Sequence, residues 1–301
     1  MDKEYDYGKL RGVGSISYRA LERARELVKE GAGRLKVAQE LESFFRGNGY
    51  EMAFPVNISV NETAAHFSPG LEDTYKFSAK DIVKIDLGAR KDVYLSDCAI
   101  TIDLSGSNGK LVEASEEALE AAISKVRAGR EVREIGREIE AVAKNKGAKP
   151  IKNLGGHGIS RDELHSRIFI PNYDNGDNEK LEDGEVIAIE PFMTDGYGAV
   201  EEGSEVQIFE KKDDVAPRSQ EAREVFSHIQ KNYLTYPFAF SWLQKEFSSL
   251  GEFKLRRALN ELAMLGGLEL YPVLIEKKSG MVAQTEKELI VTKDSCEVVT
   301  K

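Results

Sequence analysis

Residues 81–104 read DIVKIDLGARKDVYLSDCAITIDL and carry the strongest fold signal in the chain. Apolar and polar residues alternate in both halves of this stretch, which predicts two strands. If the connecting turn lies at Lys91-Asp92, the strands form a hairpin in which Asp86 faces Asp97 directly. Directly opposed side chains have Cβ atoms about 5 Å apart, so two carboxylates there repel each other unless a cation lies between them. The stretch therefore predicts both a sheet and a cation site.

Two further acids interrupt apolar segments. Glu190 lies in VIAIEPF (186–192) and Glu286 lies in VAQTEKELIV (282–291). A carboxylate buried in such a segment is costly unless it is paired, protonated or bound to metal. His157 follows two glycines in NLGGHGI, where small residues allow a close backbone approach. Four carboxylates, one imidazole and a bridging hydroxide suit two divalent cations, and mixed oxygen and nitrogen ligands favour Mn, Co, Fe or Zn over Ca.

The rest of the chain alternates between helical and strand-like patterns. Helical spacing runs from about Ser17 to Phe45 with a break near residue 32, and returns in 111–147. Three more helices are expected between Ser219 and Leu268, after a charged boundary. Short strands fill most of the remainder, so the predicted fold class is mixed, α/β or α+β.

Composition limits the function classes. The 301 residues are 41% hydrophobic and 31% charged, enough for a large core and roughly two domains, or one domain with an insertion. A net charge of −10 disfavours phosphate-mediated nucleic-acid binding. No apolar run has the length of a membrane span, the start MDKEYDYGKL is unlike a signal peptide, and two cysteines are too few for a disulfide framework. We therefore expect a cytoplasmic protein without a membrane partner.

Several segments together resemble the methionine aminopeptidase family, in that family's order and from about residue 10 to the C-terminus. They are AFPVNISVNETAAHFSP, KIDLGAR, YLSDCAITI, NLGGHGI, ELHSRIFIPN, VIAIEPF and VAQTEKELIV. The helical stretch before the last strands resembles the type 2 subfamily in its short, archaeal-like form. The resemblance implies a pita-bread fold, with two pseudo-symmetric α/β halves around a central metal pair. It also implies a catalytic domain of residues 1–215 and 272–301, interrupted by a helical, winged-helix-like subdomain of residues 216–271.

The resemblance also assigns roles to individual residues. Asp86 would chelate one metal, Asp97 and Glu286 would bridge both metals, and His157 and Glu190 would complete the second. Glu190 would also shuttle the proton from the attacking water to the leaving amine. The remaining positions would contact the substrate: His66 and His165 at the scissile amide, and Phe54, Leu164, Tyr271 and Leu274 around the methionine side chain.

One local departure from the family lies beside a ligand. The family usually has a His-Thr pair after the last glutamate, whereas this chain has Lys287-Glu288. The ligand itself is retained, but the groups that surround Glu286 differ.

The implied activity is metal-dependent removal of the initiator methionine from nascent proteins whose second residue is small. The partners would be N-terminal peptides close to the ribosome, and the protein would act as a monomer with no specific DNA affinity.

Other interpretations come from the same residues. A winged helix-turn-helix in residues 217–271 would suggest DNA binding, but seven basic and six acidic residues leave it without a strong positive footprint. A catalytically inactive ribosome-binding or RNA-binding relative, or a creatinase-like member, would lack metal ligands that are all present here. Prolidase and aminopeptidase P normally carry a further N-terminal domain, and only 85 residues precede Asp86.

Overall fold

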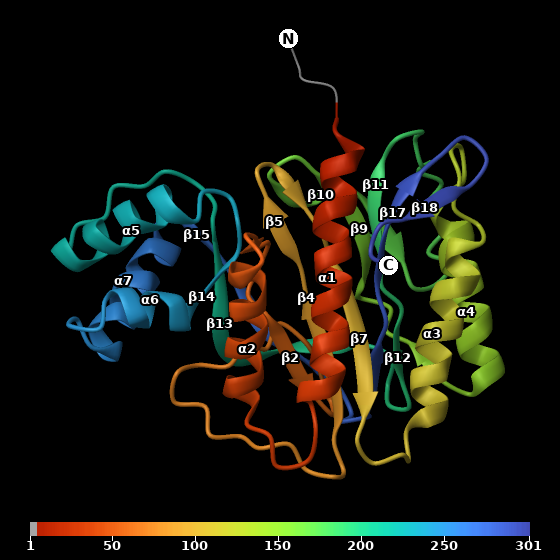
Figure 1. The fold of residues 1–301 in the computed structure, drawn as a ribbon, viewed down its shortest axis with the longest axis horizontal. Coiled ribbons are helices and arrows are strands. Elements are labelled where there is room, and N and C mark those ends of the chain that lie inside the picture. Colours follow the sequence, from red (N-terminus) through yellow and green to blue (C-terminus); the bar gives the residue numbers. More distant parts are fainter. Residues whose placement is uncertain (1–4) are drawn as a thin grey trace.

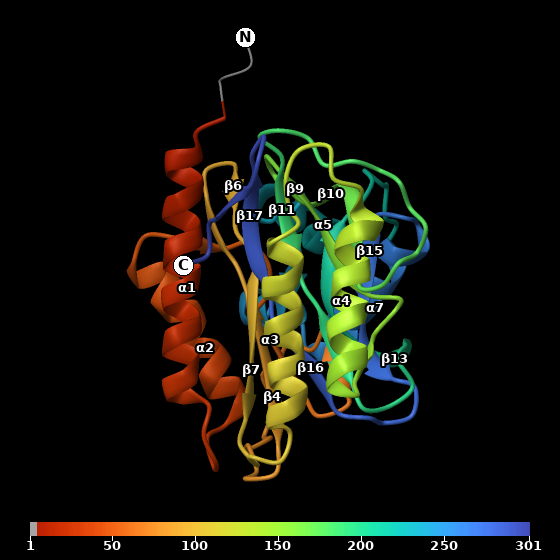
Figure 2. The ribbon, with the colours of Figure 1, turned by 90° about the vertical axis from the view of Figure 1, so that its right-hand side faces the viewer.

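The computed structural model describes residues 5–301, which form two α/β halves and a helical lobe (Figure 1). In the first half, α1 (Tyr7–Leu27) and α2 (Arg34–Gly47) pack against the sheet β2-β4-β7. In the second half, α3 (Gly109–Ile123) and α4 (Val132–Lys146) pack against the sheet β10-β9-β11-β17-β18 and its neighbours. The side view in Figure 2 shows α1 and the α3–α4 pair on the outside of the strands.

The strands of the two halves are short, and most pairs are antiparallel neighbours. They are β1 (Glu51–Met52), β2 (Asn57–Val60), β3 (Thr63–Ala65), β4 (Ile82–Leu87), β5 (Ala89–Lys91), β6 (Tyr94–Leu95), β7 (Cys98–Asp103), β8 (Lys149–Pro150), β9 (Gly155–Ser160), β10 (Glu163–Pro171), β11 (Val186–Ile189), β12 (Phe192–Thr194), β16 (Val282–Gln284), β17 (Lys287–Val291) and β18 (Cys296–Val298). Each half has its own apolar core.

The helical lobe lies between two long strands, β13 (Val200–Lys211) and β15 (Leu268–Glu276). It contains the three helices expected in this region, α5 (Gln220–Asn232), α6 (Phe240–Glu246) and α7 (Glu252–Met264), with the short strand β14 (Phe238–Ala239). Their buried residues form a third core that includes Phe209 of β13. Strands β13 and β15 pair with each other and, through β15, with β3, so one sheet joins the lobe to the first half.

The first helix begins ten residues earlier than the sequence pattern predicted, at Tyr7 rather than near Ser17. Its start is capped by Asp6, whose carboxylate accepts hydrogen bonds from the backbone N–H groups of Gly8 and Lys9. Glycines weaken the helical signal of the first turns. Tertiary packing explains one of them, because a Cβ on Gly14 would lie 2.4 Å from the Val299 side chain.

The predicted hairpin forms, but its register was wrong by two residues. The turn lies at Asp92-Val93, and Asp86 pairs with Ala99 instead of Asp97. Asp97 lies in an irregular break between β6 and β7. The break exists because the backbone of Ser96 approaches Gly88 closely, and its carbonyl oxygen would lie 1.9 Å from a Cβ at that position. Asp97 is thus offset by two residues from the position opposite Asp86, and the two carboxyl groups are still close enough to interact.

Within residues 5–301, no helix combines the length and the apolar character needed to cross a bilayer. The first four residues of the polar start considered above lie outside the described part of the chain.

Replacing Gly88 with alanine tests whether this close approach holds the break beside Asp97. The added methyl would overlap the Ser96 carbonyl and crowd the Phe54 ring at 2.8 Å. We expect a loss of roughly 1–3 kcal/mol in the free energy of unfolding, measured by denaturant titration. Gly109→Ala is the matched control, since a Cβ there meets nothing within 4 Å. Equal stability of the two variants would show that the close approach is not a constraint.

Candidate metal centre

A cavity of about 380 Å³ lies between the two halves and the long sheet of the helical lobe. All five residues expected to hold metal line it: Asp86, Asp97, His157, Glu190 and Glu286. The two histidines expected to contact substrate, His66 and His165, line the same cavity. Residues separated by up to 220 positions in the sequence therefore meet at one place.

The sequence pattern had suggested that the four acids lie inside strands. In the structure most of them lie at strand ends. Only Asp86 belongs to a regular strand, β4. Asp97 precedes β7, Glu190 follows β11, and Glu286 lies between β16 and β17, where it forms a single bridge with Ala99. Because strand pairing is interrupted at these points, side chains from different strands can converge on one centre.

The geometry of His157 indicates that a cation belongs in this cluster. Its Nδ1 lies 3.2 Å from the Gly158 carbonyl oxygen, so Nδ1 carries the proton and donates to that oxygen. The lone pair of Nε2 then faces Asp97 Oδ2 at 3.5 Å and Glu190 Oε1 at 3.9 Å. Ligand atoms of Asp97, His157 and Glu286 all lie within 4.8 Å of one another. Acceptors that face each other at this spacing are suited to binding a shared divalent cation.

Unpartnered oxygen atoms give the same indication. Asp86 Oδ1, Asp97 Oδ1 and Glu286 Oε2 are buried, and no described group donates a hydrogen bond to them. Burial and the neighbouring carboxylates raise the pKa of Asp86, Glu190 and Glu286 well above its ordinary range. Burial raises the pKa of Asp97 to about 8 and lowers that of His157 to about 4. A bound cation would supply the missing positive charge, so the residues fit a metal site.

Gln284 is a functional neighbour that the sequence reasoning missed. Its Nε2 donates to Asp86 Oδ2 at 3.4 Å and to Glu190 Oε2 at 3.3 Å, and thereby links acids from the two halves. Its backbone is held by Thr101, whose hydroxyl exchanges hydrogen bonds with the Gln284 N–H and carbonyl. The sequence feature that could have indicated this role is an amide side chain two residues before Glu286, in the same apolar segment.

The two other histidines lie beside the acids without joining them. His66 Nδ1 lies 3.2 Å from the Pro272 carbonyl oxygen, which leaves Nε2 free as an acceptor. Burial lowers the pKa of His66 to about 4, so its ring is neutral near pH 7. The backbone of His66 has a φ of +63°, which a residue with a side chain adopts rarely and often at functional sites. The ring of His165 packs edge-on against that of His157, with ring centroids 4.4 Å apart.

The wall of the cavity next to the acids is apolar. Of the four residues expected around a methionine side chain, Phe54, Leu164 and Tyr271 line the cavity. Leu274 lies outside its lining, pairs with Ala65 in the sheet and packs against a separate apolar cluster. The sequence did not single out Ile208 or Pro237, which also line the cavity and come from β13 and the helical lobe.

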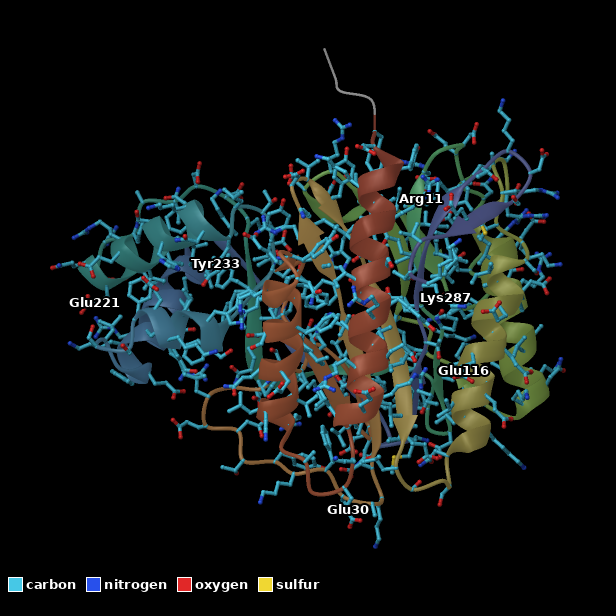
Figure 3. All side chains as sticks on the ribbon, viewed as in Figure 1. Arg11, Glu30, Glu116, Glu221, Tyr233 and Lys287 are labelled. Carbon is cyan, nitrogen blue, oxygen red and sulfur yellow. The ribbon has the colours of Figure 1, made fainter. Side chains whose placement is uncertain are left out.

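Lys287 and Glu288 are adjacent in the sequence but lie in different environments. Lys287 lies on the outer surface between α1 and α3, where its Nζ lies 2.6 Å from Glu120 (Figure 3). Glu288 is 0% exposed, and neither of its carboxylate oxygens accepts a hydrogen bond from a described donor. Burial and the nearby Asp97 raise its pKa. Glu288 thus adds a buried carboxyl group close to the four acids that line the cavity.

Comparisons with known proteins identify the family and the fold of the chain. The model of metallopeptidase family M24 matches residues 8–212. A methionine aminopeptidase from Methanocaldococcus jannaschii is 40% identical over 98% of this chain and 98% of its own. Two solved structures share the fold at 19–20% identity: a thermophilic Arx1 (TM-score 0.83, 97% of this chain, 90% of the other) and a methionine aminopeptidase from Thermotoga maritima (0.71, 100% and 98%). The chain has the pita-bread fold of these proteins.

Replacing Asp97 with asparagine tests the metal centre directly. The amide keeps the size of the side chain but removes one negative charge next to His157, so metal binding should weaken and peptide hydrolysis should fall by at least about 10²-fold. Metal content can be measured by mass spectrometry after dialysis, beside Glu286→Gln. Asp213→Asn is the matched control, because Asp213 is exposed and outside the cavity. Unchanged metal content in both cavity variants would contradict the assignment.

Proposed function

The chain belongs to metallopeptidase family M24, and we propose that it is a methionine aminopeptidase that removes the initiator methionine from proteins with a small second residue. The observation that carries this proposal is one cavity in which four carboxylates and the Nε2 of His157 adjoin an apolar wall. Relatives that match almost the whole chain are methionine aminopeptidases. The protein is a divalent-metal-dependent hydrolase of peptides.

We propose two metal ions in this cavity, of Co, Mn, Fe or Zn. Four carboxylates balance two divalent charges, and the mixed oxygen and nitrogen donors suit these metals. Asp86 would hold one ion, His157 and Glu190 the other, and Asp97 and Glu286 both. Bound there, the ions would polarise the scissile carbonyl group and lower the pKa of a water molecule.

The protein's own groups would move the proton and orient the substrate. Glu190 lies at the edge of the acid cluster, with one oxygen held by Gln284 and the other facing His157. In this position it can take a proton from the attacking water and deliver it to the leaving amine. His66 Nε2 is a free acceptor on the wall of the same cavity, and His165 lies next to His157. These two imidazoles would contact the scissile amide and stabilise the tetrahedral intermediate.

The substrate methionine would lie against the apolar wall of Phe54, Leu164 and Tyr271, with its free α-amine at the acids. The four carboxylates attract an α-ammonium group and disfavour an acidic residue next to it. Crowding by His66 and His165 would restrict the second residue of the peptide to a small side chain. Leu274 contributes indirectly in this proposal, by holding Ala65 beside His66.

The remaining assignments stay predictions. We propose a catalytic domain of residues 1–215 and 272–301 with an inserted subdomain of residues 216–271, as in the type 2 subfamily. The position of α5–α7 between β13 and β15 supports this division. Action on nascent chains near the ribosome, a monomeric state, a cytoplasmic location and the absence of specific DNA affinity stay predictions as well.

Hydrolysis of the tripeptide Met-Ala-Ser tests this function. Metal-loaded protein should release free methionine, and a chelator should abolish the release because the acids alone cannot activate water at neutral pH. Met-Leu-Ser and N-acetyl-Met-Ala-Ser should be cleaved at least about 10²-fold more slowly, as they test the second residue and the free amine. Full activity after metal removal, or equal cleavage of the acetylated peptide, would contradict the proposal.

Replacing His66 with alanine separates catalysis from metal binding. A positioned acid, base or oxyanion donor contributes about 10²-fold or more, so kcat should fall by at least that factor. Metal content should not change, because His66 does not contact the acid cluster. His228→Ala is the control, since His228 lies on α5 outside the cavity. Wild-type kcat in His66→Ala would show that this histidine has no role in the reaction.

A further inference from the structure

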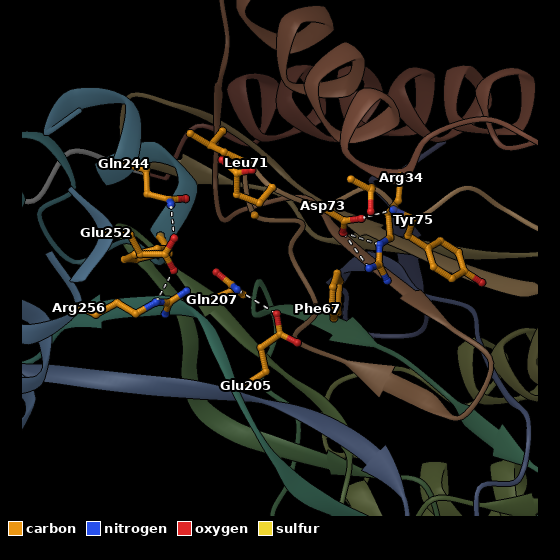
Figure 4. Close-up of a pocket in the computed structure, with 14 residues that line it drawn as sticks. Arg34, Phe67, Leu71, Asp73, Tyr75, Glu205, Gln207, Gln244, Glu252 and Arg256 are labelled. Atoms are coloured by element: carbon orange, nitrogen blue, oxygen red, sulfur yellow. Dashed lines mark hydrogen bonds and ion pairs between the residues drawn. The ribbon is translucent and has the colours of Figure 1, made fainter. Parts of the chain in front are cut away.

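A second cavity, of about 450 Å³, lies on the other face of β13 from the metal centre (Figure 4). Its walls come from residues 67–75, the start of α2, strand β13 and the helices α6 and α7. Residues that are adjacent in the sequence line different cavities. Ile208 and His66 line the metal centre, whereas Gln207 and Phe67 line the second cavity. Adjacent side chains of an extended chain point to opposite faces, which accounts for this division.

The two arginines in this second cavity are already neutralised. The guanidinium of Arg34 lies 2.8 Å from Asp73 and stacks on the Phe67 ring at 3.8 Å. Arg256 pairs with Glu252 at 2.7 Å and lies over the Phe240 ring at 3.9 Å. Each of the two arginines is therefore paired with a carboxylate in the cavity wall, as Figure 4 shows.

Two acids of the cavity have no such partner. Glu72 and Glu205 both line it, and among residues 5–301 neither forms an ion pair with a basic side chain. Glu205 accepts one hydrogen bond, at 2.9 Å, from Nε2 of Gln207. The cavity therefore carries a surplus of negative charge.

The floor of the cavity carries a buried acceptor without a donor. Gln207 is 8% exposed, and no described group donates a hydrogen bond to its Oε1, which Figure 4 shows directed into the cavity. Gln244 Oε1, on α6, is also buried without a donor. Gly70 has no side chain to cover the Gln207 amide, and a Cβ at this position would lie 3.8 Å from the Gln207 Nε2. Buried amide oxygens are nearly always hydrogen-bonded, so a ligand that brings N–H donors would complete this site.

We propose that this cavity binds a primary alkylammonium group, carried by a free polyamine or by a lysine side chain. The ammonium group would donate to the two glutamine oxygens and balance Glu72 and Glu205. Its alkyl stem would lie against the apolar side chains of Phe67, Leu71 and Phe240. An ammonium has three donors and no acceptor, which matches the two glutamine oxygens that lack a donor and the two unpaired carboxylates.

A metal ion is a poorer match than an amine. Within the described chain, three acidic or histidine ligands come close enough to share an ion only at Asp97, His157 and Glu286. The free acceptors of the second cavity are two amide oxygens and two separate carboxylates, spread over β13, α6 and the 67–75 segment. Such a spread gives no compact shell of ligands for an ion, whereas the three N–H donors of an ammonium can bond to separate acceptors.

Isothermal titration of the metal-loaded protein with spermidine, in 150 mM NaCl, tests the site. We expect one binding event per chain. Glu205→Gln should weaken binding by about ten-fold or more, because one charge-assisted contact is lost. Gln207→Leu should do the same by removing the buried acceptor. Glu202→Gln is the matched control, since it removes an equal charge from an exposed position on β13 outside both cavities.

A parallel titration with the tripeptide acetyl-Gly-Lys-Gly-amide distinguishes the sources of the amine. Tighter binding of spermidine would identify a free polyamine, tighter binding of the tripeptide would identify a lysine side chain, and either result supports the site. Binding of neither compound overturns the proposal. An equal loss in Glu202→Gln and Glu205→Gln also overturns it, because the binding would then reflect only the net charge of −10. Glu205 is exposed, so its variant keeps the test valid even if Gln207→Leu does not fold.

Discussion

The concentration of buried negative charge at the centre of the molecule is the constraint on which the rest of the structure depends. Asp86, Asp97, Glu190 and Glu286 meet within one small cavity, and Glu288 adds a further buried carboxyl behind them. Without a nearby positive charge, these carboxyl groups would have to hold protons. The raised pKa values of the four acids that line the cavity indicate this. Divalent cations would satisfy the acids and the Nε2 of His157 together. The site therefore gains stability and chemistry from the same ions.

The acids can meet because several strands end at the centre of the molecule. Each half carries two helices on its outside, so the strand breaks at Asp97, Glu190 and Glu286 point inward and are shielded from bulk water. Gly88 allows the close backbone approach of Ser96, next to Asp97. The long sheet of β13 and β15 closes the third side, with Ile208 and Tyr271 facing the acids and Gln207 facing away. A single strand thus borders both cavities.

Residue types and their order along the chain were enough to single out the five residues that meet in one cavity, the mixed fold class and the helices of the inserted region. The register of the 81–104 hairpin was not predictable in the same way, because it depends on the contact between Gly88 and Ser96, which alternation does not encode. The early start of α1 was missed because glycines weaken the helical signal of its first turns, and the packing of Gly14 against Val299 is visible only in the fold. Gln284 acts through contacts across strands, so its importance was visible only once the strands had been placed.

The most direct test of the central claim is the position of metal ions in a crystal grown with Mn²⁺, located by anomalous scattering. This account predicts two anomalous peaks in the cavity, one next to Asp86 and one next to His157 and Glu190, with Asp97 and Glu286 between them. A well-ordered cavity with no anomalous peak, or peaks only elsewhere on the protein, would contradict it.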